Sequence, residues 1–282
     1  MGLKAGDTPR KRAGWYLKVA AAFVCAAALP AAIPSASAYF QEKSVHHSGL
    51  QGTKKLALTF DDGPTNQTDD VLNILKKNGV KATFFVLGRN VDYHPAAMER
   101  MSKEGHLIAN HTVTHSRLGR RYVRNPELLL KEIGGAHQEI APFLRTDQGL
   151  YFRAPYGFWK SEHADALNAD PILKHYVGPI YWDIGGYTAI DEEGNASSSA
   201  DWDCWRREWT ADECATGYMR EIRRKKGGVV LFHDVRMRTA TMVEQMIPAL
   251  IRDGYSFITL DQIPAYDKLK TPPDKPVGKP TS

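Results

Sequence analysis

Blocks of hydrophobic positions, separated by polar stretches, predict strands and helices in alternation along most of the chain. Residues Thr68–Asn78 place Val71, Leu72 and Leu75 on one helical face. By contrast, Gly228–Phe232 is a short apolar run without polar interruption, which is typical of a buried strand. Strands are predicted at residues 55–60, 82–87, 107–110, 150–153, 180–184, 228–232 and 256–260, and helices at residues 68–78, 94–104, 125–143 and 241–252.

This alternation predicts a single α/β domain built on a parallel sheet, which forms either a barrel or an open sheet. The domain is expected at residues 53–265, behind an irregular polar leader at residues 39–52. Residues 185–203 are rich in Gly, Ser, Asp and Glu and predict an inserted loop. The Lys- and Pro-rich residues 266–282 predict a solvated tail.

The first 38 residues have the three parts of a secretory signal peptide. Basic residues up to Lys18 precede the apolar run Val19–Leu29, and Ala36-Ser37-Ala38 supplies small residues for cleavage. The apolar run is shorter than the roughly 20 residues that a membrane-spanning helix needs. We therefore expect cleavage after Ala38 and a secreted or periplasmic protein, with an uncleaved membrane anchor as the alternative.

The net charge of +5 is concentrated in this leading segment, which has five basic side chains and one acidic side chain. The rest of the chain carries 32 basic and 31 acidic residues. A nearly neutral body excludes nucleic acid as the main ligand, because binding phosphates requires a concentrated basic surface. The sequence points to no protein partner either.

Cysteine usage agrees with export. Removal of the leading segment with Cys25 leaves Cys204 and Cys214, an even number in an exported chain. We expect a disulfide between them, and two unpaired buried thiols are the alternative.

Two adjacent carboxylates, Asp61 and Asp62, follow the first predicted strand in the motif TFDDGP. The carboxyl ends of strands are where α/β folds place their active sites. Neighbouring carboxylates repel each other unless one binds a cation while the other acts as a base. The similar pair Asp69-Asp70 lies at a helix start, where the helix dipole explains acidic residues.

The motif HTVTH places His111 and His115 four residues apart. In a helix or compact turn this spacing directs both imidazoles to one side, where they can hold one divalent ion. Together with one aspartate they form a two-histidine, one-carboxylate site with positions open for water and substrate. Structural burial of either histidine alone is the alternative.

Two further motifs follow predicted strands, RAPYG with Arg153 and LFHD with His233. Taken singly, Arg153 could instead form a surface ion pair, and His233 could simply cap the end of a strand, without a functional role. The aromatic residues Trp202, Trp205 and Trp209 follow helical spacing, which favours a buried stripe over a saccharide-stacking surface. Trp182 is expected nearer the site.

In this order, TFDDGP, HTVTH, RAPYG and LFHD resemble the motifs of the polysaccharide deacetylases, the NodB-homology family of carbohydrate esterases. The resemblance covers about residues 53–265. It implies a distorted (β/α) barrel that removes acetyl groups from sugars with the help of a divalent metal.

The resemblance also implies roles for the motif residues. Asp62, His111 and His115 would bind the metal, and Asp61 would be the general base. The metal and Asp61 together would activate water for attack on the acetamide carbonyl. Zinc suits this ligand set best, and cobalt, nickel and iron are also possible.

Four further residues complete the implied site. Arg153 would orient Asp61 and keep it ionised. His233 would protonate the departing amine, and the backbone N–H of Tyr156 would stabilise the oxyanion with the metal. Leu231 would line the pocket for the acetyl methyl group.

One motif departs from the family pattern, in which an aspartate of an Asp-Trp pair tunes the acid histidine. Here the corresponding strand carries Asp183, whereas an Asp-Trp pair occurs only later, at Asp201-Trp202. We slightly favour Asp201, and the choice between the two remains open at this point.

The resulting functional prediction is an exported metal-dependent deacetylase that acts on an N-acetylglucosamine-containing glycan. Peptidoglycan, chitin-like polymers and poly-N-acetylglucosamine are all candidate substrates. An O-acetyl esterase acting on xylan-type polysaccharide is one alternative. A catalytically silent glycan-binding module with the same barrel is the other.

Overall fold

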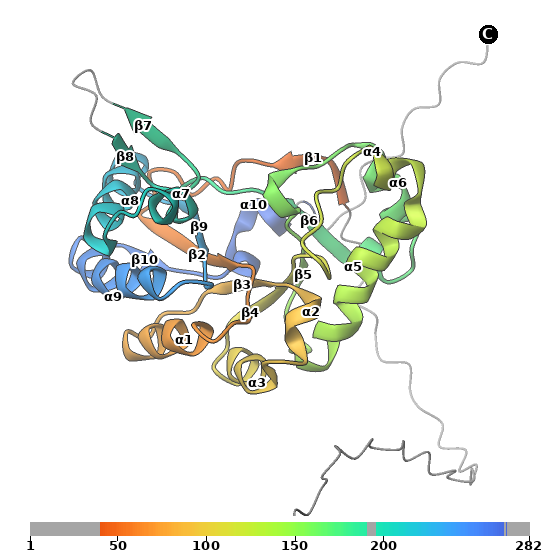
Figure 1. Ribbon diagram of the computed structural model, residues 1–282, viewed down its shortest axis with the longest axis horizontal. Helices are drawn as coiled ribbons and strands as arrows, with labels where there is room; N and C mark the ends of the chain where they lie inside the picture. Colours follow the sequence, from red (N-terminus) through yellow and green to blue (C-terminus); the bar gives the residue numbers. More distant parts are fainter. Residues whose placement is uncertain (1–39, 191–195, 268, 270–282) are drawn as a thin grey trace, which may run out of the picture. The chain divides into compact units, whose positions relative to one another are not determined.

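The computed structural model describes residues 40–190, 196–267 and 269, and strand β2 (Lys55–Asp61) lies at the centre of this part (Figure 1). β2 is buried apart from Lys55 and pairs in parallel with β9 (Gly228–His233) along its length. It also pairs with β10 (Ser256–Phe257) near its beginning and with β3 (Thr83–Val86) near its end. The next parallel strands are β4 (Leu107–Asn110), β5 (Leu150–Tyr151) and β6 (Tyr176–Ile180).

These parallel strands close into a ring. β3 pairs with β4, and a bridge between Asn110 and Phe152 continues the ring to β5 and β6. A second bridge, between Ile184 and Val230, returns the ring to β9. Because single bridges replace full ladders at these two joints, the barrel is distorted. The α/β barrel predicted from the sequence is confirmed.

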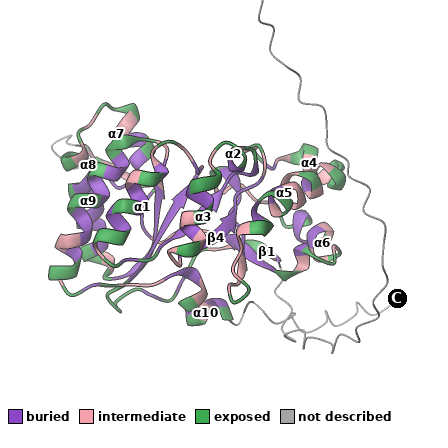
Figure 2. Ribbon diagram, turned by 90° about the horizontal axis from the view of Figure 1, so that it is seen from below, coloured by how far each residue is buried: buried purple, intermediate pink, exposed green. Residues whose placement is uncertain are grey.

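Helices pack on the outside of the strands, with buried residues facing inward and exposed residues outward (Figure 2). In α1 (Thr68–Lys77) the buried side chains include Val71, Leu72 and Leu75, as the apolar spacing predicts. The other long helices are α3 (Pro95–Lys103), α5 (Pro126–Ile140), α8 (Ala211–Lys225) and α9 (Met237–Arg252). Shorter helices are α2 (Gly88–Val91), α4 (Arg120–Arg124), α6 (Glu162–Asn168), α7 (Asp201–Arg206) and α10 (Pro264–Asp267).

The first described residues form a strand, so the predicted irregular leader at residues 39–52 is wrong for them. β1 (Phe40–Val45) pairs in parallel with β6. The side chain of Asn168 accepts from the Phe40 N–H at 2.8 Å and donates to the Phe40 carbonyl at 3.0 Å. Phe40 packs against Phe152, with ring centroids 5.4 Å apart. Phe40 is the one fully buried residue of the strand. The strand therefore has no alternation of apolar and polar residues from which it could be predicted.

Three other boundaries differ from the sequence predictions. β6 ends at Ile180, where a strand was expected to begin, and Ile184 keeps only its bridge. Tyr266 is buried in α10, so the folded domain continues past residue 265 into the predicted tail. The predicted loop at residues 185–203 contains the hairpin of β7 (Thr188–Ile190) and β8 (Ala196–Ser198), and the start of α7.

Two predictions concern residues outside the described part of the chain. These are the signal peptide at residues 1–38 and most of the tail, residues 270–282. Within the described residues, no helix is both long and apolar enough to cross a membrane.

A disulfide between Cys204 and Cys214 confirms the pairing expected from the sequence and joins α7 to α8. Both cysteines are fully buried. A cross-link that closes so short a loop stabilises a fold by about 3 kcal/mol, because it restricts the unfolded chain.

We therefore expect the double variant Cys204→Ala/Cys214→Ala to lose about 3 kcal/mol of unfolding free energy. Urea unfolding of the variant, compared with the oxidised and reduced wild-type protein, measures this loss. An unchanged unfolding midpoint in both the variant and the reduced protein would show that the cross-link contributes nothing.

Candidate active site

The motif residues meet at the carboxyl ends of the barrel strands. Asp61 at the end of β2 is in register with His233 at the end of β9. His111 directly follows β4. This edge is where α/β barrels carry their active sites. A pocket of about 780 Å³ opens there, and its lining includes Asp61, Asp62, His111, His115, Tyr156, Trp182, Leu231 and His233.

Asp62, His111 and His115 form a cluster suited to a divalent cation. Their candidate ligand atoms all lie within 4.8 Å of one another. Asp62 Oδ1 is 3.4 Å from His111 Nε2 and 3.2 Å from His115 Nε2. This oxygen is buried and has no hydrogen-bond donor among the described residues. His111 Nδ1 donates to the Arg153 carbonyl at 2.8 Å, which leaves its Nε2 lone pair directed at the cluster.

The charge states of this cluster also fit a cation. Burial alone would raise the pKa of Asp62, but the neighbouring imidazoles, His111 foremost, hold it well below the ordinary value. Burial lowers the pKa of His115 and so favours the neutral imidazole. A metal requires an ionised carboxylate and neutral imidazoles, and the directions of the Asp62 and His115 pKa shifts agree with that requirement.

Asp61 is held by a buried arginine. Arg153 Nη1 donates to Asp61 Oδ1 at 2.7 Å and to Thr59 Oγ1 at 2.8 Å. Its guanidinium lies over the Phe85 ring, 4.1 Å from the centroid. The surface ion pair considered for Arg153 is therefore wrong. Because Oδ1 is engaged by the arginine, Asp61 can present its other oxygen, Oδ2, to the pocket.

His233 is paired with Asp201, and the choice between the two candidate aspartates is thereby decided geometrically. Asp201 Oδ1 is 2.7 Å from His233 Nδ1, and Oδ2 accepts from the His233 backbone N–H at 2.7 Å. Asp183 points elsewhere and accepts from Ser48 and from the Val229 N–H. Burial alone would lower the pKa of His233, but the charge and hydrogen bond of Asp201 raise it to about 10.

Several residues around the pocket have strained backbones. Asp62, Thr112, His115 and Tyr156 have φ values of 74°, 73°, 63° and 60°, in the left-handed region that favours glycine. Such conformations cost about 1–3 kcal/mol each and concentrate at functional sites. The HTVTH segment is a turn rather than a helix, and Glu132 of α5 accepts from the Thr114 N–H at 3.0 Å.

A family model for polysaccharide deacetylase matches residues 49–172. A chitooligosaccharide deacetylase from a Bradyrhizobium strain is 31% identical over 236 residues, which are 77% of this chain and 94% of that protein. The chain belongs to the polysaccharide deacetylase family.

Other members of the family differ in length from this chain. A peptidoglycan-N-acetylglucosamine deacetylase, PgdA of Listeria monocytogenes, is 29% identical over 74% of this chain, which spans only 39% of that protein. The solved structure of the peptidoglycan deacetylase PdaC from Bacillus subtilis is 26% identical, with a TM-score of 0.58. That similarity covers 79% of this chain and 94% of the PdaC chain.

In this member of the polysaccharide deacetylase family, the residues expected to contact substrate all reach the pocket. Leu231 and Trp182 line it, and Trp182 stacks on Tyr181 with ring centroids 3.8 Å apart. Tyr156 also lines it, and no hydrogen bond holds its backbone N–H within the described part of the chain.

The buried tryptophan stripe predicted from helical spacing is wrong for one of its members. Trp202 is 50% exposed and lines the pocket, as does the half-buried Trp205. Trp209 packs against the core, as expected. The buried residues of α7 are Asp201, Asp203 and Cys204, which leaves Trp202 at the pocket.

Two supporting residues had no recognisable sequence signal. The Tyr218 hydroxyl donates to the Leu231 carbonyl at 2.8 Å and accepts from the Asp201 N–H at 3.0 Å. Thr59 accepts from Arg153 and donates to the Val230 carbonyl. In the sequence, both residues resemble ordinary positions on a buried helix face and a buried strand.

Proposed function

We propose that the protein is an exported, metal-dependent deacetylase that hydrolyses N-acetyl groups of an N-acetylglucosamine-containing glycan to acetate and free amine. The observation that carries the proposal is the arrangement of one pocket. It contains the cluster of Asp62, His111 and His115, with Asp61 beside it and the Asp201-paired His233 on the neighbouring strand. The family relationship supports the same chemistry.

Asp62, His111 and His115 would hold the cation. A bound divalent cation lowers the pKa of water and polarises a carbonyl group. Asp61 lies beside the cluster, with Oδ2 3.7 Å from His111 Nε2, and accepts the proton of the attacking water. Arg153 fixes the carboxylate so that one oxygen stays directed at that water.

His233 supplies the proton that the departing amine requires. An amide nitrogen is a poor leaving group until it is protonated, so the acid is essential for N-deacetylation. Asp201 orients the imidazole through Nδ1, which leaves Nε2 for the substrate. The free N–H of Tyr156 donates to the carbonyl oxygen as negative charge develops on it. Leu231 contacts the acetyl methyl group.

The Asp201–His233 pair predicts a shift in the pH profile. Asp201 raises the pKa of His233, so Asp201→Asn should lower it. The acid must be protonated, and the rate falls as the pH rises through its pKa. We therefore expect the alkaline limb of kcat/KM to move to lower pH by about one unit or more.

The matched control for this pH profile is Asp183→Asn, which removes the same charge from the other candidate aspartate. Asp183 is hydrogen-bonded to Ser48 and Val229 instead of His233. The alkaline limb of kcat/KM should therefore not move in the Asp183→Asn variant. A shift with Asp183→Asn and none with Asp201→Asn would reverse the assignment.

Metal, export and substrate are further parts of the proposal. Zinc is the expected metal, and cobalt, nickel and iron also accept two imidazoles and a carboxylate. Cleavage after Ala38 would leave one residue before β1 begins at Phe40, so the proposed mature chain retains the described fold. Peptidoglycan and chitin-like oligomers are the proposed substrates, because the relatives named above act on them.

Acetate release from the purified mature protein, residues 39–282, tests the function. N-acetylglucosamine oligomers, peptidoglycan and acetylated xylan would each be offered with zinc, with cobalt and with a chelator. Chelator-sensitive release from the first two is expected. Release from xylan alone would show an ester hydrolase, and no release despite bound metal would favour a glycan-binding module or a glycan not among those offered.

A further inference from the structure

A second pocket adjoins the catalytic pocket on the side of the β7–β8 hairpin. It has a volume of about 530 Å³. Tyr181, Trp182 and Gly186 line both pockets. A glycan whose acetylated sugar occupies the catalytic pocket can therefore extend a neighbouring sugar across this shared wall into the second pocket.

The two carboxylates of the second pocket are already engaged by the protein. Glu221 Oε2 accepts from the Gly185 N–H at 3.1 Å and from the Ser199 hydroxyl at 2.5 Å, and Oε1 pairs with Lys225 at 2.8 Å. Asp183 is held by the Ser48 hydroxyl and the Val229 N–H. Glu221 thereby holds the inserted segment against α8, with its charge balanced by Lys225, whereas Asp183 is hydrogen-bonded by neutral donors.

The remaining charges at this end of the groove are positive. Among the described residues, Arg220 has no ion-pair partner, and Arg224 has only Glu221, at 3.8 Å. Arg236, on the rim of the catalytic pocket, is likewise without an ion-pair partner in the described part. Because the chain beyond residue 38 has a net charge of only +1, these guanidinium groups form a locally positive part of the groove.

Aromatic rings accompany these cations. Trp182, stacked on Tyr181, forms the shared wall, and the largely exposed Tyr187 lines the second pocket. Ring faces offer apolar surface to a sugar, while guanidinium groups bind carboxylates in a bidentate manner. The pocket thus combines a surface for a sugar ring with donors for an anion.

We propose that this second pocket is a subsite for a carboxylate-bearing sugar adjacent to the sugar that is deacetylated, with Arg220 and Arg224 as its anion-binding residues. The inference rests on the proposed function, and it narrows the substrate class to acidic acetylated glycans. The carboxylate can come from the lactyl ether of a muramic acid or from a uronic acid, and both present the same group to the arginines.

Binding tests this subsite independently of turnover. Calorimetry would compare four ligands. Two are oligosaccharides that alternate N-acetylglucosamine with muramic acid or with glucuronic acid, and the other two are the same oligosaccharides after reduction of their carboxylates to alcohols. We expect the wild-type protein to bind at least one carboxylate form about tenfold or more tightly than its reduced form. The ligand that shows the preference identifies the source of the carboxylate.

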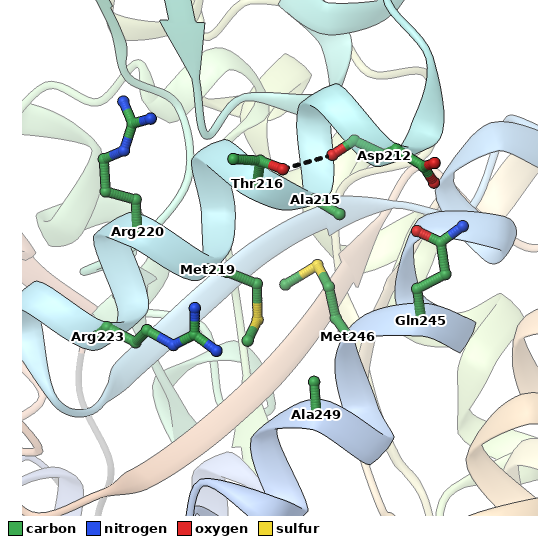
Figure 3. A pocket seen from close by; sticks show the side chains of 9 residues that line it. All are labelled: Asp212, Ala215, Thr216, Met219, Arg220, Arg223, Gln245, Met246 and Ala249. Atoms are coloured by element: carbon green, nitrogen blue, oxygen red, sulfur yellow. Dashed lines mark hydrogen bonds between the residues drawn. The ribbon is translucent and has the colours of Figure 1, made fainter.

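The double variant Arg220→Gln/Arg224→Gln should lose that preference. Its affinity for both forms should equal the affinity of the wild-type protein for the reduced form. Arg223→Gln is the matched control, because it removes the same charge from α8. Arg223 is paired with Asp253 at 2.8 Å. In Figure 3 it extends along the groove between α8 and α9 toward Met219, whereas Arg220 is directed away from Arg223. This control should keep the full preference.

Equal binding of the carboxylate and reduced forms by the wild-type protein would overturn the subsite. An unchanged preference in the double variant would overturn the assignment to Arg220 and Arg224. Acetate release from neutral N-acetylglucosamine oligomers is measured alongside, and the double variant should retain it. Failure of the wild-type protein to release acetate from any glycan would refute the proposed function, while a carboxylate preference in binding would still establish the subsite.

Discussion

Asp61→Asn is expected to lower the rate of acetate release by about 10²–10⁴-fold, because an amide cannot accept the proton of the attacking water. Metal binding should persist, since Asp62, His111 and His115 are unchanged. The two readouts are single-turnover acetate release and the metal content of the dialysed protein. Loss of turnover with retention of metal separates the proton acceptor from the cation ligands.

Asp70→Asn is the control for this substitution. Asp70 lies in the first turn of α1, away from the pocket lining, so both turnover and metal content should stay at wild-type levels. If Asp61→Asn kept turnover within a few-fold of wild type, Asp61 would not be the base. Loss of metal in the same variant would instead make it a ligand.

His111→Ala is expected to abolish both metal binding and turnover. His111 contributes one of two imidazoles, and its Nδ1 contact to the Arg153 carbonyl orients the ring. Removal of one of three protein ligands leaves a site that does not retain its ion through dialysis. Metal content after dialysis, acetate release and the circular dichroism spectrum of the variant are the measurements.

His163→Ala separates loss of the metal from general damage to the fold. Like His111, His163 is buried and bonded to a backbone carbonyl, that of Leu118 at 2.9 Å. It lies outside the pocket lining, so its replacement should lower stability without removing the metal. Retention of metal and turnover by a folded His111→Ala variant would refute the ligand assignment.

The barrel could be predicted from the sequence because its central strands are buried on both sides. Runs such as Gly228–Phe232 are apolar throughout, and they alternate with helices whose apolar residues share one face. The motif residues follow such strands directly. Since parallel strands end at the same edge, Asp61 and His233 could be expected to meet although they are far apart in sequence.

Features that depend on tertiary packing could not be predicted in this way. β1 is a strand because Asn168 and β6 hold its backbone, while only one of its side chains, Phe40, is buried. The pairing of Asp201 with His233 depends on how α7 is placed, and both Asp183 and Asp201 were acceptable in the sequence. Trp202 follows helical spacing, but α7 buries Asp201 and Cys204 and leaves Trp202 exposed at the pocket.

The proposed acidic-sugar subsite also depends on tertiary packing and could not be predicted from the sequence. Arg220 and Arg224 lie on α8, and in the sequence they form part of a basic helix end that is ordinary for a solvated helix. Only the position of the β7–β8 hairpin beside α8 brings them to the catalytic groove. Local sequence pattern carries no information about such an arrangement.

The most direct test of the central claim is the appearance of free amine in N-acetylglucosamine oligomers, measured with chelator-stripped protein before and after metal is restored. The stripped protein should release no amine. One equivalent of zinc or cobalt should restore activity. One free amine should then form for each acetate released. Full activity of the stripped protein, or no amine from a protein shown to contain one metal ion, would contradict a metal-dependent glycan N-deacetylase.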